Sequence, residues 1–377
     1  MRLAYIGEFG VPSIYANSVQ VMKMCDAFAR LGHRVTLLIP GEEEDIEQRA
    51  FSFYGMEPSF EIRALSSRPL DGWPHAYAWR VAGYVHRMKP DAVYGRALYG
   101  CAATAALGVP TALEVHHPVT GRIAPRVVRF LAGRKAFSHI VAISGALRDY
   151  CIDHLRLVPE NTIAAHDGAD AGEMRFSPPV RPVERVGYVG HLYPGRGIDV
   201  ILALAMRFPE LTFHIVGGAR KDVEGWKDKV ALPNVVFHGH VAYEKVPALY
   251  ADMDVLLAPY QRQVTVGGGK DTARWMSPLK IFEYMASVRP VICSDLPVLH
   301  EVHEPGKTAL LVPPDDVNAW AAALRSLMDD PALRRRLTIT AWEKLKREFT
   351  WTVRAERVLA PLVERHERAS SRAEKER

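Results

Sequence analysis

Short apolar segments with the length of buried strands alternate with helix-like segments along almost the whole chain, and this alternation most restricts the fold. It is typical of βαβ units, in which parallel strands form a sheet and helices cover it. Residues 3–7 and 35–40 are two such strands, and apolar positions at helical spacing fill 16–31 between them. Further strands are expected at 91–95, 111–115, 139–144, 185–190, 212–218, 234–239, 254–259, 290–294 and 309–313.

A proline-rich stretch, MRFSPPVRPVE at 174–184, divides this pattern into two halves. Prolines at this density favour an extended linker, and the strand-helix alternation starts again after it. We therefore predict an α/β protein with two Rossmann-like, doubly wound parallel-sheet domains, 1–175 and 183–351, facing each other across a cleft. The last helix, about 352–377, is expected to pack back on the first domain. Ligands of such sheets bind at the carboxyl ends of the strands.

Composition excludes several classes of protein. The chain is 48% hydrophobic and 24% charged, as globular proteins are, and its four cysteines are too scattered for a zinc ribbon or a disulfide framework. No apolar run reaches the ~18–20 residues of a membrane span. Despite a net charge of +5, no nucleic-acid-binding motif is present. We expect a cytoplasmic protein that binds no nucleic acid.

The segment 276–295, MSPLKIFEYMASVRPVICSD, combines a helix start with groups suited to a nucleotide. Pro278 fits the first turn of a helix, where a missing N–H costs nothing. The free amides near Ser277, together with Lys280, form an anion site. One turn further, the carboxylate of Glu283 can accept two hydroxyls at once, as a ribose diol requires. The alternative, which this segment alone leaves open, is a capped surface helix with an ordinary glutamate.

The loop in GYVGHLYPGRGID, 187–199, is the second candidate. A strand leads into glycines that include Gly190, and Arg196 can form paired hydrogen bonds to phosphate oxygens. The loop is neither a GxGxxG turn nor a P-loop, which argues against a NAD-dependent oxidoreductase. A plain strand-to-helix turn is the alternative.

Several segments, taken in chain order, make the sequence similar to the family 4 glycosyltransferases of the GT-B fold, also called glycosyltransferase group 1. The resemblance implies transfer of a sugar from a nucleotide-diphosphate sugar to a hydroxyl acceptor with retention of configuration. It implies no cofactor beyond this co-substrate. We also expect no metal, because Asp252 and Asp254 directly precede a buried strand. The segments that carry the resemblance are 16–38, 113–118, 166–176, 190–197 and 277–302.

The resemblance assigns the donor site residue by residue. Glu283 matches the second glutamate of the family's E-x7-E motif, which binds the ribose, whereas Trp275 stands where the first glutamate belongs. Arg196 and Lys280 are expected to stabilise the leaving diphosphate, with His191 a weaker phosphate ligand because imidazole is charged only below pH ~6.5. The remaining donor-binding residues implied are Gly190, Ser277, Pro278, Leu279, Gly239 and Val241.

On the acceptor side, His116 matches the family's histidine near the reacting carbon, where a titratable nitrogen can steady or deprotonate a hydroxyl. His117 is expected to point the other way along the strand. A structural histidine is the alternative reading of His116. Gly10, Asn17 and Ser18 lie in the loop after the first strand, where phosphates or the acceptor approach.

The run GGGK at 267–270 is interpreted as a mobile loop over the donor, because no strand leads into it. The residues that follow it, Asp271, Thr272 and Arg274, are candidate sugar contacts.

Two basic and aromatic stretches in the first domain, 73–89 and 121–137, resemble interfacial helices. They suggest peripheral contact with an anionic inner membrane leaflet and a lipid-linked acceptor. Ordinary helices packed on the sheet are the alternative.

We therefore expect a glycosyltransferase of bacterial polysaccharide or glycoconjugate biosynthesis, with a UDP-sugar favoured over GDP-mannose as donor and a sugar, lipid-linked or small-molecule acceptor. Two alternatives remain open. One is a nucleotide-sugar 2-epimerase on the same fold, although no convincingly placed catalytic carboxylates were found. The other is a non-catalytic nucleotide-sugar-binding partner of another transferase, which Trp275 and His191 favour.

Overall fold

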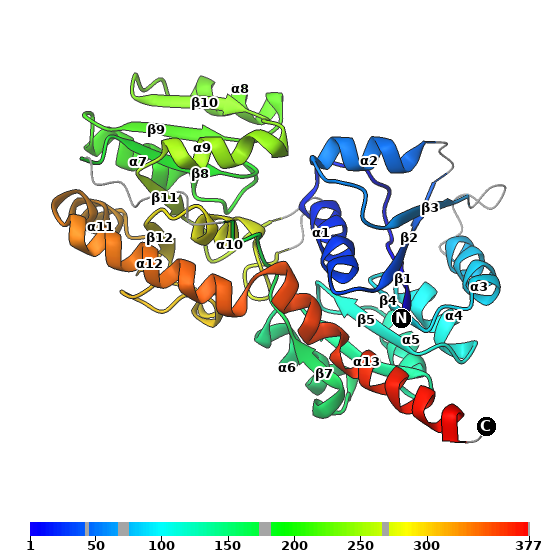
Figure 1. Cartoon of the computed structure of the whole chain (residues 1–377). Helices are drawn as coiled ribbons and strands as arrows, with labels where there is room; N and C mark the ends of the chain where they lie inside the picture. Colours follow the sequence, from blue (N-terminus) through cyan, green and yellow to red (C-terminus); the bar gives the residue numbers. More distant parts are fainter. Residues whose placement is uncertain (42–44, 67–74, 173–181, 266–270, 376–377) are drawn as a thin grey trace. The chain divides into compact units, whose positions relative to one another are not determined.

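The computed structural model describes residues 1–41, 45–66, 75–172, 182–265 and 271–375. The chain forms two compact units (Figure 1). Unit 1 contains residues 1–166 and 351–377, and unit 2 contains residues 167–350. Both are built on parallel sheets, which confirms the predicted fold class.

Unit 1 has a seven-stranded sheet in the order β3-β2-β1-β4-β5-β6-β7. Its strands are β1 (Arg2–Ile6), β2 (Arg34–Pro40), β3 (Glu61–Leu65), β4 (Ala92–Gly95), β5 (Thr111–Val115), β6 (Phe137–Ala142) and β7 (Thr162–Ala164). Its helices are α1 (Ala16–Arg30), α2 (Ile46–Tyr54), α3 (Ala76–Met88), α4 (Leu98–Ala106), α5 (Ala124–Ala132), α6 (Gly145–Leu155), the 3-10 helix η1 (Pro159–Asn161) and α13 (Trp351–Lys375).

Unit 2 has a six-stranded sheet in the order β10-β9-β8-β11-β12-β13. Its strands are β8 (Arg185–Val189), β9 (Thr212–Val216), β10 (Val235–Gly239), β11 (Val255–Ala258), β12 (Val291–Ser294) and β13 (Leu310–Val312). Its helices are α7 (Ile198–Arg207), α8 (Arg220–Lys229), α9 (Val246–Asp252), α10 (Leu279–Ala286), α11 (Val317–Asp329), α12 (Pro331–Glu348) and the 3-10 helices η2 (Tyr243–Lys245) and η3 (Pro297–Glu301).

Both faces of the unit 2 sheet are covered, as the apolar run of β11 requires. Val255 and Leu257 belong to one core cluster, whereas Leu256 and Ala258 belong to another. Successive side chains of a strand point to opposite faces, so the two clusters are the two sides of the sheet. A strand buried on both faces reads as an uninterrupted apolar segment, which is why it is easily found in the sequence.

The two edge strands of unit 1, β3 and β7, were not predicted. β3 carries Glu61 and Arg63 within five residues, and β7 is only three residues long. An edge strand pairs on one side only and tolerates polar residues and short length. Its sequence therefore lacks the apolar run that identifies the central strands.

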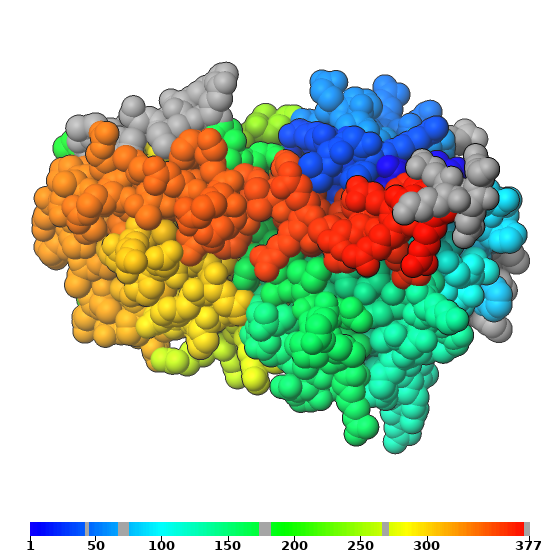
Figure 2. All heavy atoms as spheres, turned by 60° about the horizontal axis from the view of Figure 1, so that its bottom comes forward, coloured from blue at the N-terminus to red at the C-terminus, as the bar shows by residue number. Residues whose placement is uncertain are grey.

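The last helix, α13, belongs to unit 1. It contacts α1 and β6, and Figure 2 shows it on the surface of the unit between blue N-terminal residues and cyan to green residues. The ring of His139 on β6 is hydrogen-bonded to the carbonyl of Val358 at 2.9 Å. Residues from both ends of the chain therefore build one unit.

The boundary between the units lies earlier than the predicted proline-rich stretch. Asp167 N–H donates to Ser277 Oγ at 2.8 Å, and Ala169 N–H donates to the carbonyl of Phe349 at 3.1 Å. These contacts place residues from 167 onward in unit 2, although the first domain was predicted to extend to 175. Packing against unit 2 begins before the prolines, and most of the proline-rich stretch lies outside the described residues.

No helix in the described residues is both long and apolar enough to cross a membrane.

Candidate active site

The loop after β8 is shaped by close backbone approaches. Gly197 has φ +74° and its α-carbon faces the carbonyl of Pro259, which follows β11. A side chain at this position would collide with that carbonyl, so only glycine lets the loop pass. Gly190 has φ +149°, and a Cβ there would lie 2.5 Å from Lys280 Nζ. The predicted glycine loop and the predicted lysine are therefore direct neighbours.

Helix α10 carries this lysine in its first turn. Pro278 is the N-cap residue, with φ −75°, and the helix follows directly after it. Tyr284, one turn after Lys280, accepts a hydrogen bond from Val189 N–H at 2.9 Å and is itself buried. This contact fixes α10 against the end of β8 and sets the position of Lys280.

Lys280 is buried, and its ammonium group has no hydrogen-bond partner among the described residues. Its Nζ lies 3.7 Å from the ring centre of Tyr188 and 5.3 Å from that of Tyr260. Burial, and next the neighbouring charge of Arg196, lower the pKa of Lys280 well below its usual range. The charge of Glu283 offsets these effects only in part. An anionic ligand would stabilise an enclosed ammonium that has no hydrogen-bond partner.

Arg196 adds a second positive charge beside Lys280. Its guanidinium lies 5.3 Å from the ring centre of Tyr260, and its buried Nε has no hydrogen-bond partner in the described part of the chain. His191 stacks on Tyr193 with 4.9 Å between ring centres. Burial, Arg196 and Lys280 all lower the pKa of His191, so this ring is neutral at pH 7.

Glu283 is held by two tyrosines. Tyr243 OH donates to Glu283 Oε1 at 3.1 Å, and Tyr250 OH donates to Oε2 at 2.8 Å. Both hydroxyls stay protonated, because burial and the charge of Glu283 raise their pKa values. The two hydrogen bonds therefore fix the orientation of the carboxylate.

The other predicted donor residues of unit 2 have different surroundings. Ser277 is buried and its hydroxyl oxygen accepts from Asp167 N–H, so its side chain holds the chain where it enters unit 2. Arg274 lies over the Trp275 ring at 4.6 Å. The carbonyl of Gly239 accepts from Gly217 N–H at 2.7 Å. Leu279 and Val241 are half-buried.

The loop proposed to cover the donor, 267–270, lies outside the described residues. Directly after it, Asp271 Oδ1 accepts from the backbone N–H groups of Val264 and Ala273 at 2.9 and 3.0 Å. Thr272 is buried and donates to the carbonyl of Val264 at 3.1 Å. Both side chains therefore stabilise the local backbone around residues 264 and 271–273.

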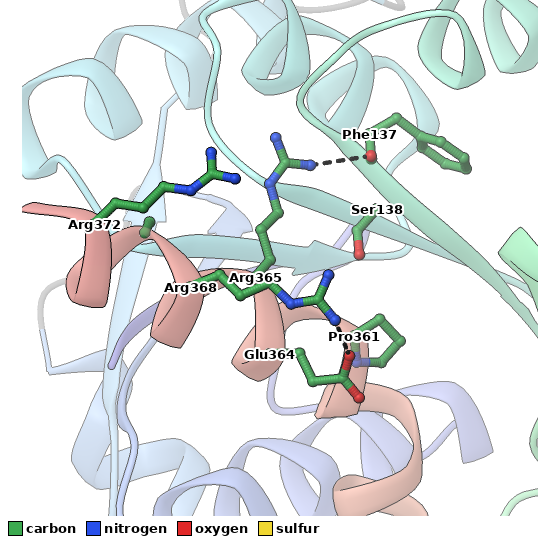
Figure 3. A pocket seen from close by; sticks show the side chains of 8 residues that line it. Phe137, Ser138, Pro361, Glu364, Arg365, Arg368 and Arg372 are labelled. Carbon is green, nitrogen blue, oxygen red and sulfur yellow. Dashed lines mark hydrogen bonds and ion pairs between the residues drawn. The ribbon is translucent and has the colours of Figure 1, made fainter.

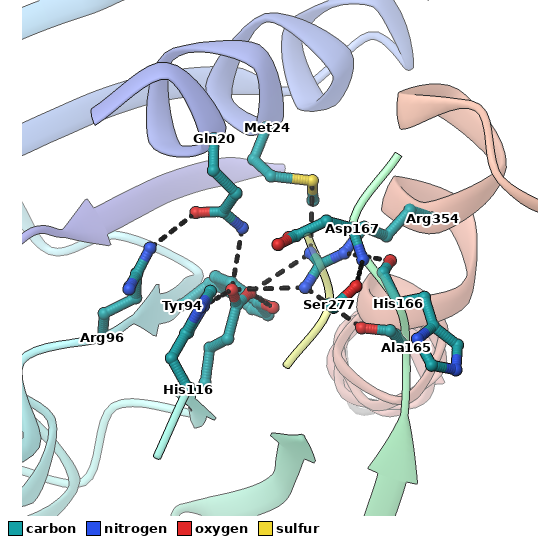
Figure 4. A network of polar contacts seen from close by, with 11 residues as sticks. Gln20, Met24, Tyr94, Arg96, His116, Ala165, His166, Asp167, Ser277 and Arg354 are labelled. Atoms are coloured by element: carbon teal, nitrogen blue, oxygen red, sulfur yellow. Dashed lines mark hydrogen bonds and ion pairs between the residues drawn. The ribbon is translucent and has the colours of Figure 1, made fainter. Parts of the chain in front are cut away.

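In unit 1, His116 follows the end of β5 and contacts a second titratable group. Its Nε2 lies 2.5 Å from Oε1 of Glu114, which is fully buried two residues earlier on the same face. Burial, and next the charge of Arg96, lower the pKa of His116 to about 3. Figure 4 shows this contact within a network that includes residues of α1, β4 and α13. His117 is exposed.

The loop after β1 uses its predicted residues differently. Ser18 is buried at the start of α1, and its hydroxyl donates to the carbonyls of Ser13 and Tyr15 at 2.9 and 2.7 Å. Asn17 Oδ1 accepts from Ser18 N–H at 2.9 Å. Gly10 is exposed. Ser18 thus shapes the loop, whereas Gly10 remains open to a ligand.

Two family models match the chain, one in each half. Residues 18–173 match Glycosyltransferase Family 4, and residues 183–330 match Glycosyl transferases group 1. The chain belongs to the family 4 glycosyltransferases.

One relative of this glycosyltransferase spans nearly its full length, and others match part of it. A GDP-mannose-dependent alpha-mannosyltransferase of Mycolicibacterium smegmatis is 27% identical, with 94% of each chain covered. An alpha-D-kanosaminyltransferase of Streptomyces kanamyceticus is 25% identical over 62% of this chain and 65% of its own. Among solved structures, Anabaena HepE in complex with UDP has a TM-score of 0.74 at 18% identity, with 97% of this chain and 100% of that chain covered.

The residues of the glycosyltransferase that surround the predicted ones were not predicted from the sequence. Tyr188 and Tyr260 enclose Lys280, and Tyr243 and Tyr250 hold Glu283. Tyrosine in an apolar segment is also an ordinary core residue, so these gave no specific signal. Glu114, in contrast, did give a specific signal in the sequence, because a carboxylate inside the apolar strand TALEV needs hydrogen-bond partners.

The surface of unit 1 carries a further cavity between α13 and the start of β6, lined by Arg365, Arg368 and Arg372 (Figure 3). Arg365 donates to the carbonyls of Phe137 and Lys135, and Arg368 pairs with Glu364. Two of the three arginines are thus already engaged within the unit.

The two stretches considered for membrane contact form α3 and α5. Each buries an apolar side on its own unit, including Val81 and Val85 of α3 and Val128 of α5. Each also exposes a large apolar side chain, Trp79 at 77% and Phe130 at 45%.

Proposed function

We propose that this glycosyltransferase is a retaining, metal-independent enzyme that transfers a sugar from a nucleotide-diphosphate sugar to a hydroxyl of its acceptor. The buried ammonium of Lys280 carries this proposal, because it has no hydrogen-bond partner among the described residues and faces Gly190, which carries no side chain. A diphosphate supplies the missing charge, and the glycine leaves room for it.

Lys280, Arg196 and the amides at the start of α10 act on the leaving group. As the bond between the sugar C1 and the diphosphate oxygen breaks, negative charge grows on that oxygen, and fixed positive groups stabilise it. Because these groups supply the charge, the reaction needs no metal. Glu283 accepts hydrogen bonds from the ribose hydroxyls and thereby holds the nucleotide in register.

Retention follows if the acceptor attacks from the face that the diphosphate leaves. The acceptor hydroxyl first donates to His116, and as its oxygen bonds to C1 its proton turns to an oxygen of the departing diphosphate and passes to it. No protein carboxylate then forms a covalent intermediate. His116 of unit 1 binds the acceptor hydroxyl and orients it.

The donor candidates are UDP-sugars and GDP-mannose. The preference for UDP rests only on how common UDP-sugars are as donors. The solved complex with UDP is similar to this chain in fold and does not identify the donor. The mannosyltransferase that matches over the full length is named GDP-mannose-dependent, which supports the second candidate. The proposed pathway is bacterial polysaccharide or glycoconjugate assembly.

The exposed apolar and basic residues of α3 and α5 support peripheral contact with an anionic leaflet and a lipid-linked acceptor. Co-sedimentation with phosphatidylglycerol vesicles tests this contact. Substitution of both Arg126 and Arg129, which are exposed on α5, by glutamine should reduce the bound fraction. Equal binding of both proteins would contradict it.

A thermal-shift panel with UDP, GDP, UDP-glucose and GDP-mannose, in EDTA, tests the donor site. A ligand at a hundredfold excess over Kd stabilises a protein by about 2.7 kcal/mol, which shifts the melting temperature. We expect one nucleotide series to shift the melt and its sugar form to be hydrolysed. Glu283→Ala should remove both effects. The matched control is Glu210→Ala. Glu210 is an exposed glutamate just before the N-terminal end of β9, whereas the predicted ligand site lies at the carboxyl ends of the strands.

Each other outcome has a defined meaning. If nothing binds, or if Glu283→Ala behaves like Glu210→Ala, the assigned donor site is wrong. Binding without hydrolysis or transfer would favour a non-catalytic partner. Conversion of the bound sugar to its 2-epimer would favour the epimerase. Loss of activity in EDTA would contradict metal independence, and an inverted anomeric product would contradict retention.

A further inference from the structure

Glu114 is a carboxylate buried in the middle of the unit 1 sheet, with its side chain fully enclosed. Burial of an ionised carboxylate is strongly unfavourable unless donors surround it. Its oxygens accept from Gln20 Nε2 at 2.8 Å, from Tyr94 OH and from Arg354 NH1 at 3.2 Å, and Arg354 NH2 forms an ion pair with Oε1 at 3.2 Å. Although burial alone would raise the pKa of Glu114, Arg354 and the hydrogen bond from His116 hold it well below its usual range.

The state of Glu114 decides which nitrogen of His116 carries the proton. An ionised carboxylate only accepts hydrogen bonds, so the contact between Oε1 and Nε2 requires the proton on Nε2. Arg96 lies on the other side of the network, where its NH1 donates to Gln20 Oε1 at 2.9 Å, and its charge disfavours a second proton on the ring. A neutral ring with Nε2–H has a lone pair on Nδ1.

Nδ1 of His116 remains open in this network. It has no hydrogen-bond partner in the described part of the chain. It is also not among the fully buried side-chain atoms there that lack a partner, so it is accessible to solvent. The side chain as a whole is 13% exposed. An alcohol that approaches this atom finds an acceptor whose direction is already fixed.

We propose that Glu114 is a positioning residue, which holds His116 as the Nε2–H tautomer so that Nδ1 accepts a hydrogen bond from the acceptor hydroxyl. The identity of this hydroxyl rests on the proposed function, whereas the tautomer does not. Arg354 supports the arrangement from α13, because its two contacts keep Glu114 ionised.

The competing explanation is a purely structural ion pair that fastens α13 to β5. Two variants separate the explanations. Glu114→Gln keeps the shape but replaces the ionised acceptor by a neutral amide, so the ring proton is no longer held on Nε2. Tyr94→Phe removes another donor to the same carboxylate and leaves the contact with His116 intact. It is the matched control for general damage to the network.

The tautomer is measured by NMR on the full chain with ¹⁵N-labelled histidine rings, with the His116→Gln spectrum identifying the signals. We expect the proton on Nε2 in the wild type and in Tyr94→Phe, and a mixture of the Nε2–H and Nδ1–H tautomers in Glu114→Gln. A proton on Nδ1 in the wild type overturns the proposal, and this result needs no variant of Glu114. An unchanged tautomer in Glu114→Gln overturns it as well.

Steady-state transfer kinetics supply the second measurement. Glu114→Gln should lower kcat at least tenfold, while KM for the donor stays within twofold because the donor contacts lie in unit 2. Tyr94→Phe should stay within threefold of wild type. In a His116→Gln background, Glu114→Gln should have no further effect on kcat. An equal loss in that background overturns the proposal. If the wild type transfers no sugar, the proposed function fails, and the NMR result still decides the tautomer.

Discussion

Unit 1 and unit 2 each bury a charged side chain, and they treat it in opposite ways. Glu114 in unit 1 receives hydrogen bonds from four side chains, including a two-pronged contact with Arg354. Lys280 in unit 2 has two aromatic rings for neighbours and no hydrogen-bond partner among the described residues. Burial and charge are common to both, so they do not distinguish the two roles. Hydrogen-bond satisfaction does, because an unsatisfied buried ion is stable only if a ligand completes it.

The largest effect is expected when the satisfied ion, Glu114, loses its ion-pair partner Arg354. Arg354→Met leaves Glu114 as an unpaired buried charge, which typically costs about 3–5 kcal/mol. The free energy of unfolding, measured in urea, should fall by this amount. Arg368→Met, at a 78% exposed arginine of the same helix, should change it by less than about 0.5 kcal/mol. Similar losses in both variants would show that the ion pair is not what stabilises unit 1.

Removal of the unsatisfied ion should affect binding rather than folding. Lys280→Met should weaken nucleotide binding by about 10- to 100-fold, the worth of a hydrogen bond to a charged group (about 1.5–3 kcal/mol), as calorimetry would measure. Its melting temperature without ligand should not fall. Lys229→Met is the control, since Lys229 also lies over an aromatic ring, Trp226 at 4.6 Å, but is exposed. A lower melting temperature in Lys280→Met would mean that the ammonium already has its counter-charge.

The same comparison predicts a pH dependence on the alkaline side. Since the pKa of Lys280 is lowered by folding, the unfolded chain binds one more proton between that pKa and 10.5. The free energy of unfolding therefore rises with pH in this window, by at most about 1.4 kcal/mol per pH unit. As pH rises, the urea midpoint of wild type should increase relative to that of Lys280→Met. A saturating nucleotide diphosphate should make this relative increase smaller. Parallel curves for the two proteins would refute this.

The smallest effect concerns Glu283, which two tyrosines orient. Tyr250→Phe removes one hydrogen bond to Glu283, which is worth about 0.5–1.5 kcal/mol, so nucleotide Kd should rise roughly 2- to 10-fold. A 2′-deoxynucleotide lacks one of the hydroxyls that Glu283 is proposed to bind, so its Kd should change less. An equal change for both nucleotides would show that Tyr250 does not act through the ribose contact.

The fold was largely predictable because its central strands are buried on both faces. Segments such as VTLLIP and DVLLAP correspond to β2 and β11 within a residue or two. The edge strands β3 and β7 could not be found in this way, since one-sided pairing imposes no apolar run. The boundary between the units was misplaced because prolines mark an extended backbone, whereas the boundary depends on what Asp167 and Ala169 contact.

The candidate site was predictable where its residues are close in sequence. Gly190 and Arg196 share one loop, and Lys280 and Glu283 share one helix turn, so spacing alone relates them. The structure then brings the loop and the helix together. Glu114 and Arg354 are separated by 240 positions, and no local pattern connects two residues that far apart. Long-range pairs of this kind become visible only in the folded chain.

The discontinuity of unit 1 has a consequence for biosynthesis. Unit 2 is one continuous stretch, complete once residue 350 has left the ribosome. Unit 1 begins first but lacks α13 until residues 351–375 have been synthesised, and until then Glu114 has no Arg354 beside it. Domains generally fold as units during synthesis. The half of the protein that is translated first is therefore the last to reach its native structure.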